Sequence, residues 1–163
     1  MKSLIVTICI LGLVGMVVGV AVKGADTAGV AATVTAQNIS VAVADGSVEY
    51  GTLPVNTTKS TLVNELTDLQ TATNNGNVTE NFNIRGTDSG TWTLGATAGS
   101  NVYVHKFSKN SGGLWTALTI DYQELATGIA KDGTQTFDLQ ITTPTATTYF
   151  TEQLVNVTVQ ATI

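Results

Sequence analysis

The alternation over residues 153–163 constrains the fold more than any other feature of the sequence. Apolar and polar side chains take turns there up to the last residue. Alternation of this length indicates a β-strand with one buried face. The buried side would carry Val155, Val157, Val159, Ala161 and Ile163. We expect no anchor or sorting signal after this strand, and we expect another segment to cover its free edge.

The N-terminus predicts export. Lys2 precedes an apolar run that reaches Val22, which is typical of a secretory signal peptide. We therefore divide the chain into a signal peptide (1–24), a linker with a candidate donor strand (25–43) and a β-sandwich domain (44–163). The apolar run is also marginally long enough to span a bilayer. A retained hydrophobic helix, as a membrane anchor or as the core of a pilin-like filament, is therefore the second interpretation.

The remainder of the chain is typical of an all-β protein. It is rich in Thr, Val, Gly and Asn and has only 12% charged residues. About nine or ten short strands are separated by turn signals every 8 to 12 residues, which predicts a single Ig-like or jelly-roll-type β-sandwich. Asn-Gly at residues 75–76 predicts a hairpin between two strands. Residues 121–128 are expected to form a short helical turn.

Charge and cysteine content narrow the possible partners. The formal net charge is −5, and no basic stripe is present to neutralise phosphates, so nucleic acid is not expected as a partner. An anionic membrane surface is not expected either, and the membrane would be met only through the leader before cleavage. The one cysteine, Cys9, lies in the apolar leader, so the mature chain has no disulfide.

No pattern in the sequence predicts catalysis. His105 is the only histidine, so neither a zinc site nor a nucleophile–histidine pair can be assembled from spacing, and we interpret His105 as a partly buried strand residue. The aspartates are scattered and mostly lie at turns. We expect no enzyme activity, no metal and no cofactor.

The exported chain has four N-glycosylation acceptor motifs of the form Asn-X-Ser/Thr. Their asparagines are Asn38, Asn56, Asn77 and Asn156. Covalent glycans on these residues would project from polar positions and shield the surface.

Two resemblances follow from these patterns. The stretch GTLPVNTT (51–58), followed by TATNNGNV (71–78), resembles an Ig-like pattern that is widespread in secreted bacterial and archaeal surface proteins. This resemblance covers roughly residues 41–84 and implies a fold more than a function. The architecture, a single sandwich with an extra N-terminal strand, also resembles the subunits of donor-strand pili and extracellular fibres, including archaeal bundling pili and TasA-like matrix fibres.

The first functional hypothesis is therefore a structural subunit of an extracellular filament. Its N-terminal segment, about residues 28–43, would add a strand to an open edge of a second copy beside residues 153–163. The expected donor contacts are Val34, Ala36, Ile39, Val41 and Val43.

The second hypothesis is a monomeric secreted or cell-surface module that binds glycan or protein. Tyr103, Trp92 or Trp115 would then form a carbohydrate platform, although core packing is the simpler interpretation of each.

Overall fold

The computed structural model describes residues 27–163, and this part of the chain is all-β with no helix. The signal peptide, the retained-helix alternative and Cys9 lie outside the described residues. One compact unit spans Ala36–Ile163. It therefore includes the strand at 41–44, which the sequence division assigns to the segment before the sandwich. Residues 27–35 belong to no strand.

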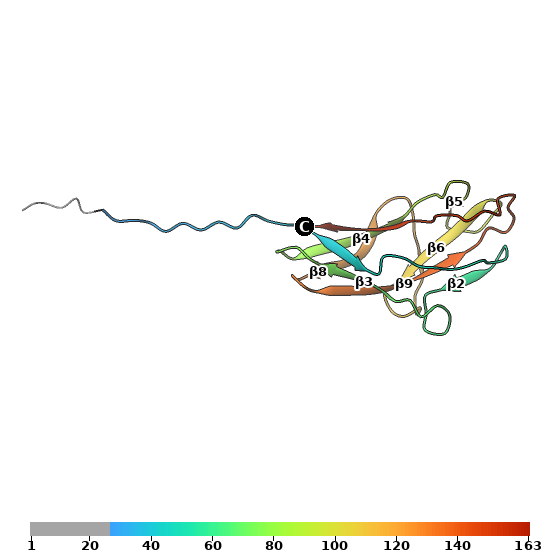
Figure 1. The fold of residues 1–163 in the computed structure, drawn as a ribbon, viewed down its shortest axis with the longest axis horizontal. Coiled ribbons are helices and arrows are strands. Elements are labelled where there is room, and N and C mark those ends of the chain that lie inside the picture. Colours follow the sequence, from blue (N-terminus) through green and yellow to red (C-terminus); the bar gives the residue numbers. More distant parts are fainter. Residues whose placement is uncertain (1–26) are drawn as a thin grey trace, which may run out of the picture. The chain divides into compact units, whose positions relative to one another are not determined.

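Ten strands make up this unit (Figure 1). They are β1 (Val41–Ala44), β2 (Thr58–Ser60), β3 (Gln70–Asn74), β4 (Glu80–Gly86), β5 (Thr93–Leu94), β6 (Val102–Ser108), β7 (Thr116–Ala117), β8 (Gln123–Ile129), β9 (Thr134–Thr142) and β10 (Val157–Thr162).

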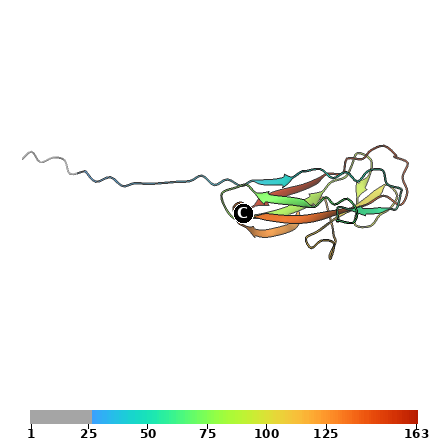
Figure 2. The ribbon, with the colours of Figure 1, turned by 60° about the horizontal axis from the view of Figure 1, so that its bottom comes forward.

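The strands form two separate sheets, an arrangement consistent with a β-sandwich (Figure 2). The larger sheet has the order β1-β3-β9-β6-β5, with β2 also paired to β9 and β7 to β6. The smaller sheet has the order β10-β4-β8. All pairings are antiparallel except that of β5 with β6.

Side chains from both sheets share the main hydrophobic core. Phe82 and Ile84 of β4 and Leu125 of β8 are fully buried against Phe107 of β6 and Phe137 of β9. The strands expected at residues 102–108 and 137–141 are present, but three consecutive residues are buried in each, 103–105 and 137–139, so both faces of these strands are covered there. The alternation at the C-terminus also corresponds to a strand, β10, which is shorter than expected because residues 153–156 have no strand partner.

The hairpin predicted at Asn-Gly is wrong. β3 and β4 flank this turn but belong to different sheets, so the turn connects the two layers. The Asn74 side chain directs this course: its Oδ1 accepts from Gly76 N at 2.8 Å, and its Nδ2 donates to the carbonyls of Val78 and Ile129. Gly76 does not adopt the positive φ that a type I′ hairpin turn requires.

The helical turn predicted at residues 121–128 is also wrong. Most of that segment is β8, which pairs with β4 through a register shift. Leu125 and Ala126 are consecutive and both buried, so the irregular pairing breaks the alternation that would have identified a strand.

We predict that Gly76→Ala destabilises the domain by about 1–3 kcal/mol, because overpacking forces neighbouring atoms apart. A Cβ at this position would lie 2.1 Å from Glu80 Oε1 and 2.5 Å from the Asn38 carbonyl oxygen. Gly90→Ala is the matched control, since nothing lies within 4 Å of its Cβ position. Urea unfolding of both variants measures the difference, and equal midpoints would contradict the prediction.

Candidate functional site: a groove between two free strand edges

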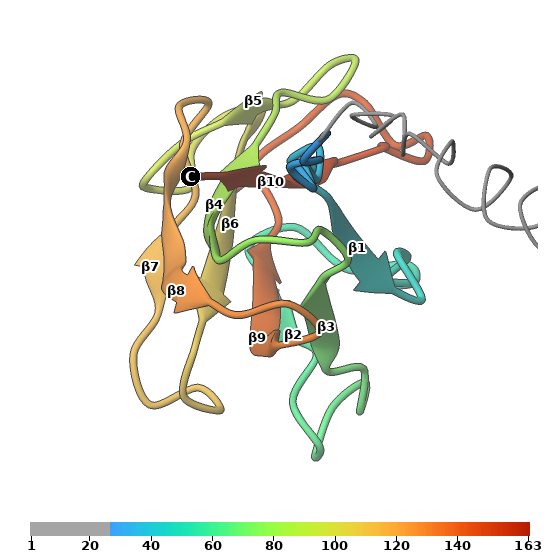
Figure 3. The same cartoon turned by 90° about the vertical axis from the view of Figure 1, so that its left-hand side faces the viewer.

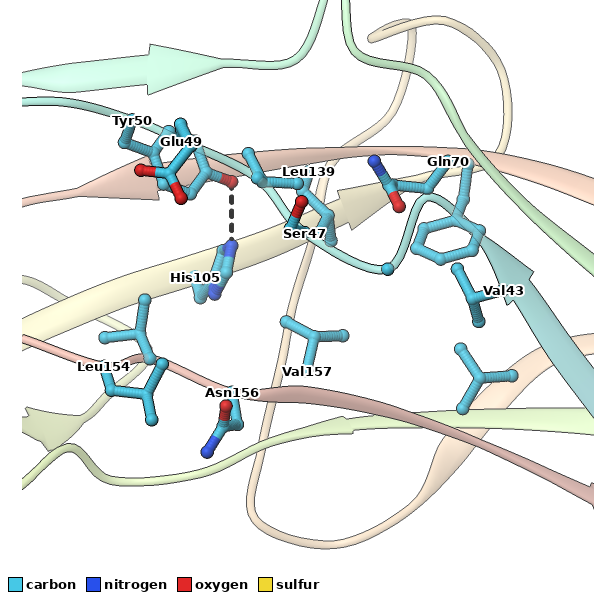
Figure 4. A pocket seen from close by; sticks show the side chains of 15 residues that line it. Val43, Ser47, Glu49, Tyr50, Gln70, His105, Leu139, Leu154, Asn156 and Val157 are labelled. Atoms are coloured by element: carbon cyan, nitrogen blue, oxygen red, sulfur yellow. Dashed lines mark hydrogen bonds between the residues drawn. The ribbon is translucent and has the colours of Figure 1, made fainter.

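An open groove of about 280 Å³ lies between the segment that contains β1 and the segment that contains β10 (Figure 4). Its apolar lining comes from both sheets, and its polar lining comes mainly from the chain after β1. The lining residues are Val43, Gly46, Ser47, Val48, Glu49, Tyr50, Gln70, His105, Phe137, Leu139, Leu154, Val155, Asn156, Val157 and Val159.

The groove follows from the sheet topology. β1 is the first strand of the larger sheet and bonds only to β3, while β10 is the first strand of the smaller sheet and bonds only to β4. Both strands lie on the same side of the domain (Figure 3). Some of their Cα atoms come within 8 Å of each other, but the two strands do not pair. Among residues 27–163, each of these two strands therefore has one backbone edge without a strand partner.

The turn after β1 starts the polar wall of the groove. Asp45 and Gly46 both adopt positive φ, 69° and 71°, and Gly46 N donates to the Ala44 carbonyl at 2.9 Å. Glycine adopts positive φ without steric cost because it has no Cβ, and aspartate is one of the few other residues that adopt it. After this turn the chain no longer pairs with β3, and residues 46–50 follow the groove without joining a sheet.

One end of the groove has an aromatic floor. His105 of β6 is buried, and its Nε2 lies 2.9 Å from the Tyr50 hydroxyl (Figure 4). Tyr103 packs beside the same imidazole, with ring centroids 6.4 Å apart. The other imidazole nitrogen, Nδ1, is buried without a hydrogen-bond partner. Burial lowers the pKa of His105 to about 4, because a charged imidazolium loses its hydration there.

The groove presents apolar side chains along the segment that contains β10. Leu154 is 73% exposed at the groove, while Val157 and Val159 are half-buried against the core. Its tyrosine and histidine are bonded to each other beneath the surface. No group of three or more His, Cys, Asp or Glu residues in the described part of the chain is placed to hold a metal ion.

The residues predicted as the acceptor edge divide into two groups. Val155, Val157 and Val159 line the groove. Ala161 lies further along β10, packed against the core, and Ile163 is 67% exposed beyond the end of the strand. Neither of these two lines the groove.

The residues predicted as donor contacts are also divided. Val41 and Val43 lie in β1, where they pair with Asn74 and Ala72 of the same chain, and Ile39 lies just before it. Val34 is 96% exposed and belongs to no strand. Ala36 begins the compact unit.

The segment before the compact unit has the side-chain alternation of a strand. We call residues 27–35 the arm. The alternation runs through the whole arm and into Ala36: one side has alanine or valine throughout, and the other has mainly threonine and glycine. The apolar side consists of Ala28, Val30, Ala32, Val34 and Ala36, and all five are exposed. An exposed segment with this pattern has the side-chain period of a strand but no sheet to join.

The glycosylation acceptors are all exposed, in four different settings. Asn38 precedes β1, Asn56 lies in a loop with φ of 53°, and Asn156 lines the groove. The Asn77 side chain is hydrogen-bonded to the backbone of residues 36 and 38. Whether any of them carries a glycan stays a prediction.

The aromatic residues of the second hypothesis do not form an exposed platform. Tyr103 is fully buried, so it cannot stack on a sugar. Trp92 is half-buried, and its indole N–H donates to Thr147 at 3.1 Å. Trp115 is half-buried as well, near Leu62 and Gly112.

Comparisons with known proteins add no relationship: no protein-family model, no curated protein and no solved structure matches this chain. Within residues 27–163, no helix has the length and apolar character needed to cross a membrane.

We predict that acid weakens the fold through His105. The folded state keeps the imidazole neutral to a pKa of about 4, whereas the unfolded chain takes up the proton near 6.5. The unfolded state therefore binds more protons between these values, and the free energy of unfolding falls as the pH is lowered from 7 to 4.5.

The variant His105→Gln isolates this contribution because it removes the titrating group. We expect the loss of unfolding free energy between pH 7 and pH 4.5 to be about 2–3 kcal/mol smaller in this variant than in the wild type. Urea unfolding at both pH values measures it. Parallel pH profiles for the two proteins would contradict the assignment of a buried, neutral histidine.

Proposed function

We propose that this protein is a structural subunit of an extracellular filament, in which the arm of one copy enters the groove of the next. This is β-strand addition, in which backbone hydrogen bonds provide affinity and alternate side chains provide register. The finer fold assignment, an Ig-like or jelly-roll-type sandwich released after removal of a signal peptide, is part of the same proposal.

The observation that carries the proposal is the contrast between protected and unprotected strand edges. β10 has six residues, and neither β10 nor β1 contains a charged residue or a proline. Natural sheets normally protect a free edge with charges, prolines, bulges or very short strands. Two adjacent edges without charge, proline or bulge favour a strand partner.

The other edges of the two sheets are protected in the usual ways. β8, the far edge of the smaller sheet, has a register shift and includes Glu124, which pairs with Lys109 at 3.9 Å. β5 and β7, at the far side of the larger sheet, have two residues each, and β2, which pairs only with β9, has three residues and includes Lys59. The lack of protection is therefore local to the groove.

The shape and lining of the groove favour an extended segment over a small molecule. Ligand pockets usually bury most of the ligand, whereas this site is an open groove. Valine and alanine side chains at every second position of the arm match the apolar side of the groove, formed by Leu154, Val155 and Val157.

Strand spacing indicates where the arm enters. An inserted strand keeps its two neighbours about 9.5 Å apart, twice the normal interstrand distance. β1 and β10 approach more closely than that, within 8 Å, so they leave no room between them at those positions. We therefore place the arm away from that approach, between residues 46–50 and 154–157, where it would run beside the segment that leads into β10.

This contact makes an open polymer. The donor and the acceptor are different surfaces, so the interface is heterologous, and a head-to-tail contact that does not close on itself generates a fibre. The partner is a second copy of this chain, and the site needs no cofactor.

We predict that Val30→Asp with Val34→Asp abolishes filaments, because two carboxylates would be buried without partners. Thr33→Asp with Thr35→Asp is the matched control, since these residues lie on the other side of the arm. Negative-stain microscopy of the full exported chain measures assembly. Filaments from the valine variant, or a wild type that stays a monomer under all conditions, would contradict the proposal and favour a monomeric surface module.

A second prediction tests the acceptor side. Leu154→Asp is expected to abolish assembly because Leu154 lines the groove. Leu114→Asp is the matched control and is expected to assemble, since Leu114 is about equally exposed, 69% against 73%, but does not line the groove. Mixing the Leu154→Asp variant with the Val30/Val34 variant should give discrete dimers, since the first retains an intact arm and the second an intact groove. Light scattering distinguishes dimers from monomers, and a mixture that stays monomeric would contradict the pairing of arm and groove.

A further inference from the structure

The backbone just after the arm is held to its own domain by one asparagine. Asn77 Nδ2 donates to the Ala36 carbonyl at 2.8 Å, and Asn77 Oδ1 accepts from Asn38 N at 2.8 Å. The Asn77 backbone N–H also donates to the Asn38 carbonyl, at 3.1 Å. The amide of Asn77 therefore bonds to the segment as a neighbouring strand would, with both its donor and its acceptor in use.

The same segment is held again two residues later. Asn75 N donates to the Ser40 carbonyl, and Ser40 N donates to Glu80 Oε1, each at 2.8 Å. From Ser40 the chain continues into β1, whose first residue pairs with Asn74. Residues 36–44 are thus bonded to their own domain along their length, although β3 itself ends at Asn74.

The exposure of Asn77 indicates what these bonds do. Asn77 is exposed, as are Ala36 and Asn38, so water would satisfy the same polar groups if the side chain were absent. The bonds are therefore not required to bury polar groups. What they do is fix the course of the backbone at the residue that follows the arm.

We infer that Asn77 is the positioning residue of the joint between subunits: it ends the donated segment at Thr35 and leaves no free linker between the arm and the domain that donates it. This inference rests on the proposed filament function. In such a polymer each arm is fixed at one end by Asn77 of its own domain and along its length by the groove of the next copy.

The mechanical consequence is a stiff filament. Without the two side-chain bonds, residues 36 and 37 become a short flexible linker, because the Asn77 backbone N–H still holds the Asn38 carbonyl. The root-mean-square end-to-end distance of two such residues is about 8 Å. Bending would then concentrate at every joint. Filament stiffness is therefore a property that responds to Asn77 even when arm, groove and core are unchanged.

The test compares filaments of the full exported chain carrying Asn77→Ala with filaments carrying Thr79→Ala. Both changes remove the glycosylation acceptor Asn77-Val78-Thr79, but only the first removes the side-chain amide that bonds to Ala36 and Asn38. We expect Asn77→Ala to lower the persistence length several-fold in negative-stain images, to speed hydrogen exchange at the Asn38 amide, and to leave the melting temperature of the monomer close to that of Thr79→Ala.

The outcomes separate the two proposals. Absence of filaments from the wild type would overturn the proposed function itself. Filaments of Asn77→Ala that are as stiff as those of Thr79→Ala would overturn the inference and leave the function intact. If Asn77→Ala lowers the melting temperature of the monomer, the variant Asn77→Asp is the deciding test. It keeps an acceptor oxygen for the Asn38 N–H but loses the donor to the Ala36 carbonyl. Filaments of Asn77→Asp that are as stiff as the wild type would contradict the positioning role of Asn77.

Discussion

The proposed assembly depends on two neighbouring strands, β1 and β10, that each have a free backbone edge. A strand in a sheet has N–H and C=O groups on both sides, and groups that lack a protein partner must stay in water or find another chain. β1 and β10 each have one such side, both are uncharged, and an apolar groove lies between their segments. The domain thus combines a stable core with one boundary that its own residues do not complete.

The core and this boundary are built from the same strands. Val157 and Val159 face the packed interior from β10 and also line the groove, and Val43 does the same from β1. An arm that enters the groove would therefore extend the hydrophobic core instead of lying on a separate surface patch. Added apolar contact of this kind is worth about 25 cal/mol per Å² that is removed from water, so assembly would also stabilise the domains that it joins.

The sequence predicted those parts of the fold in which local pattern and tertiary role agree. The alternation in β6, β9 and β10 located these strands correctly, although β6 and β9 each bury three consecutive residues and so are covered on both faces there. The hairpin predicted from Asn-Gly was wrong because the conformation there depends on a residue distant in sequence. The carbonyl of Ile129 accepts a hydrogen bond from the Asn74 side chain. The alternation failed at β8, where a register shift places two consecutive residues in the core. The groove could not be predicted at all, since it depends on which edges of two sheets come together.

The most direct measurement of the central claim is a filament map from native material at a resolution that shows side chains. In the proposed filament, residues 27–35 of the neighbouring copy form an extra strand beside residues 154–157 of every subunit, with Val30 and Val34 facing the groove. An arm folded against its own domain, or a filament in which the groove between residues 46–50 and 154–157 is empty, would contradict it.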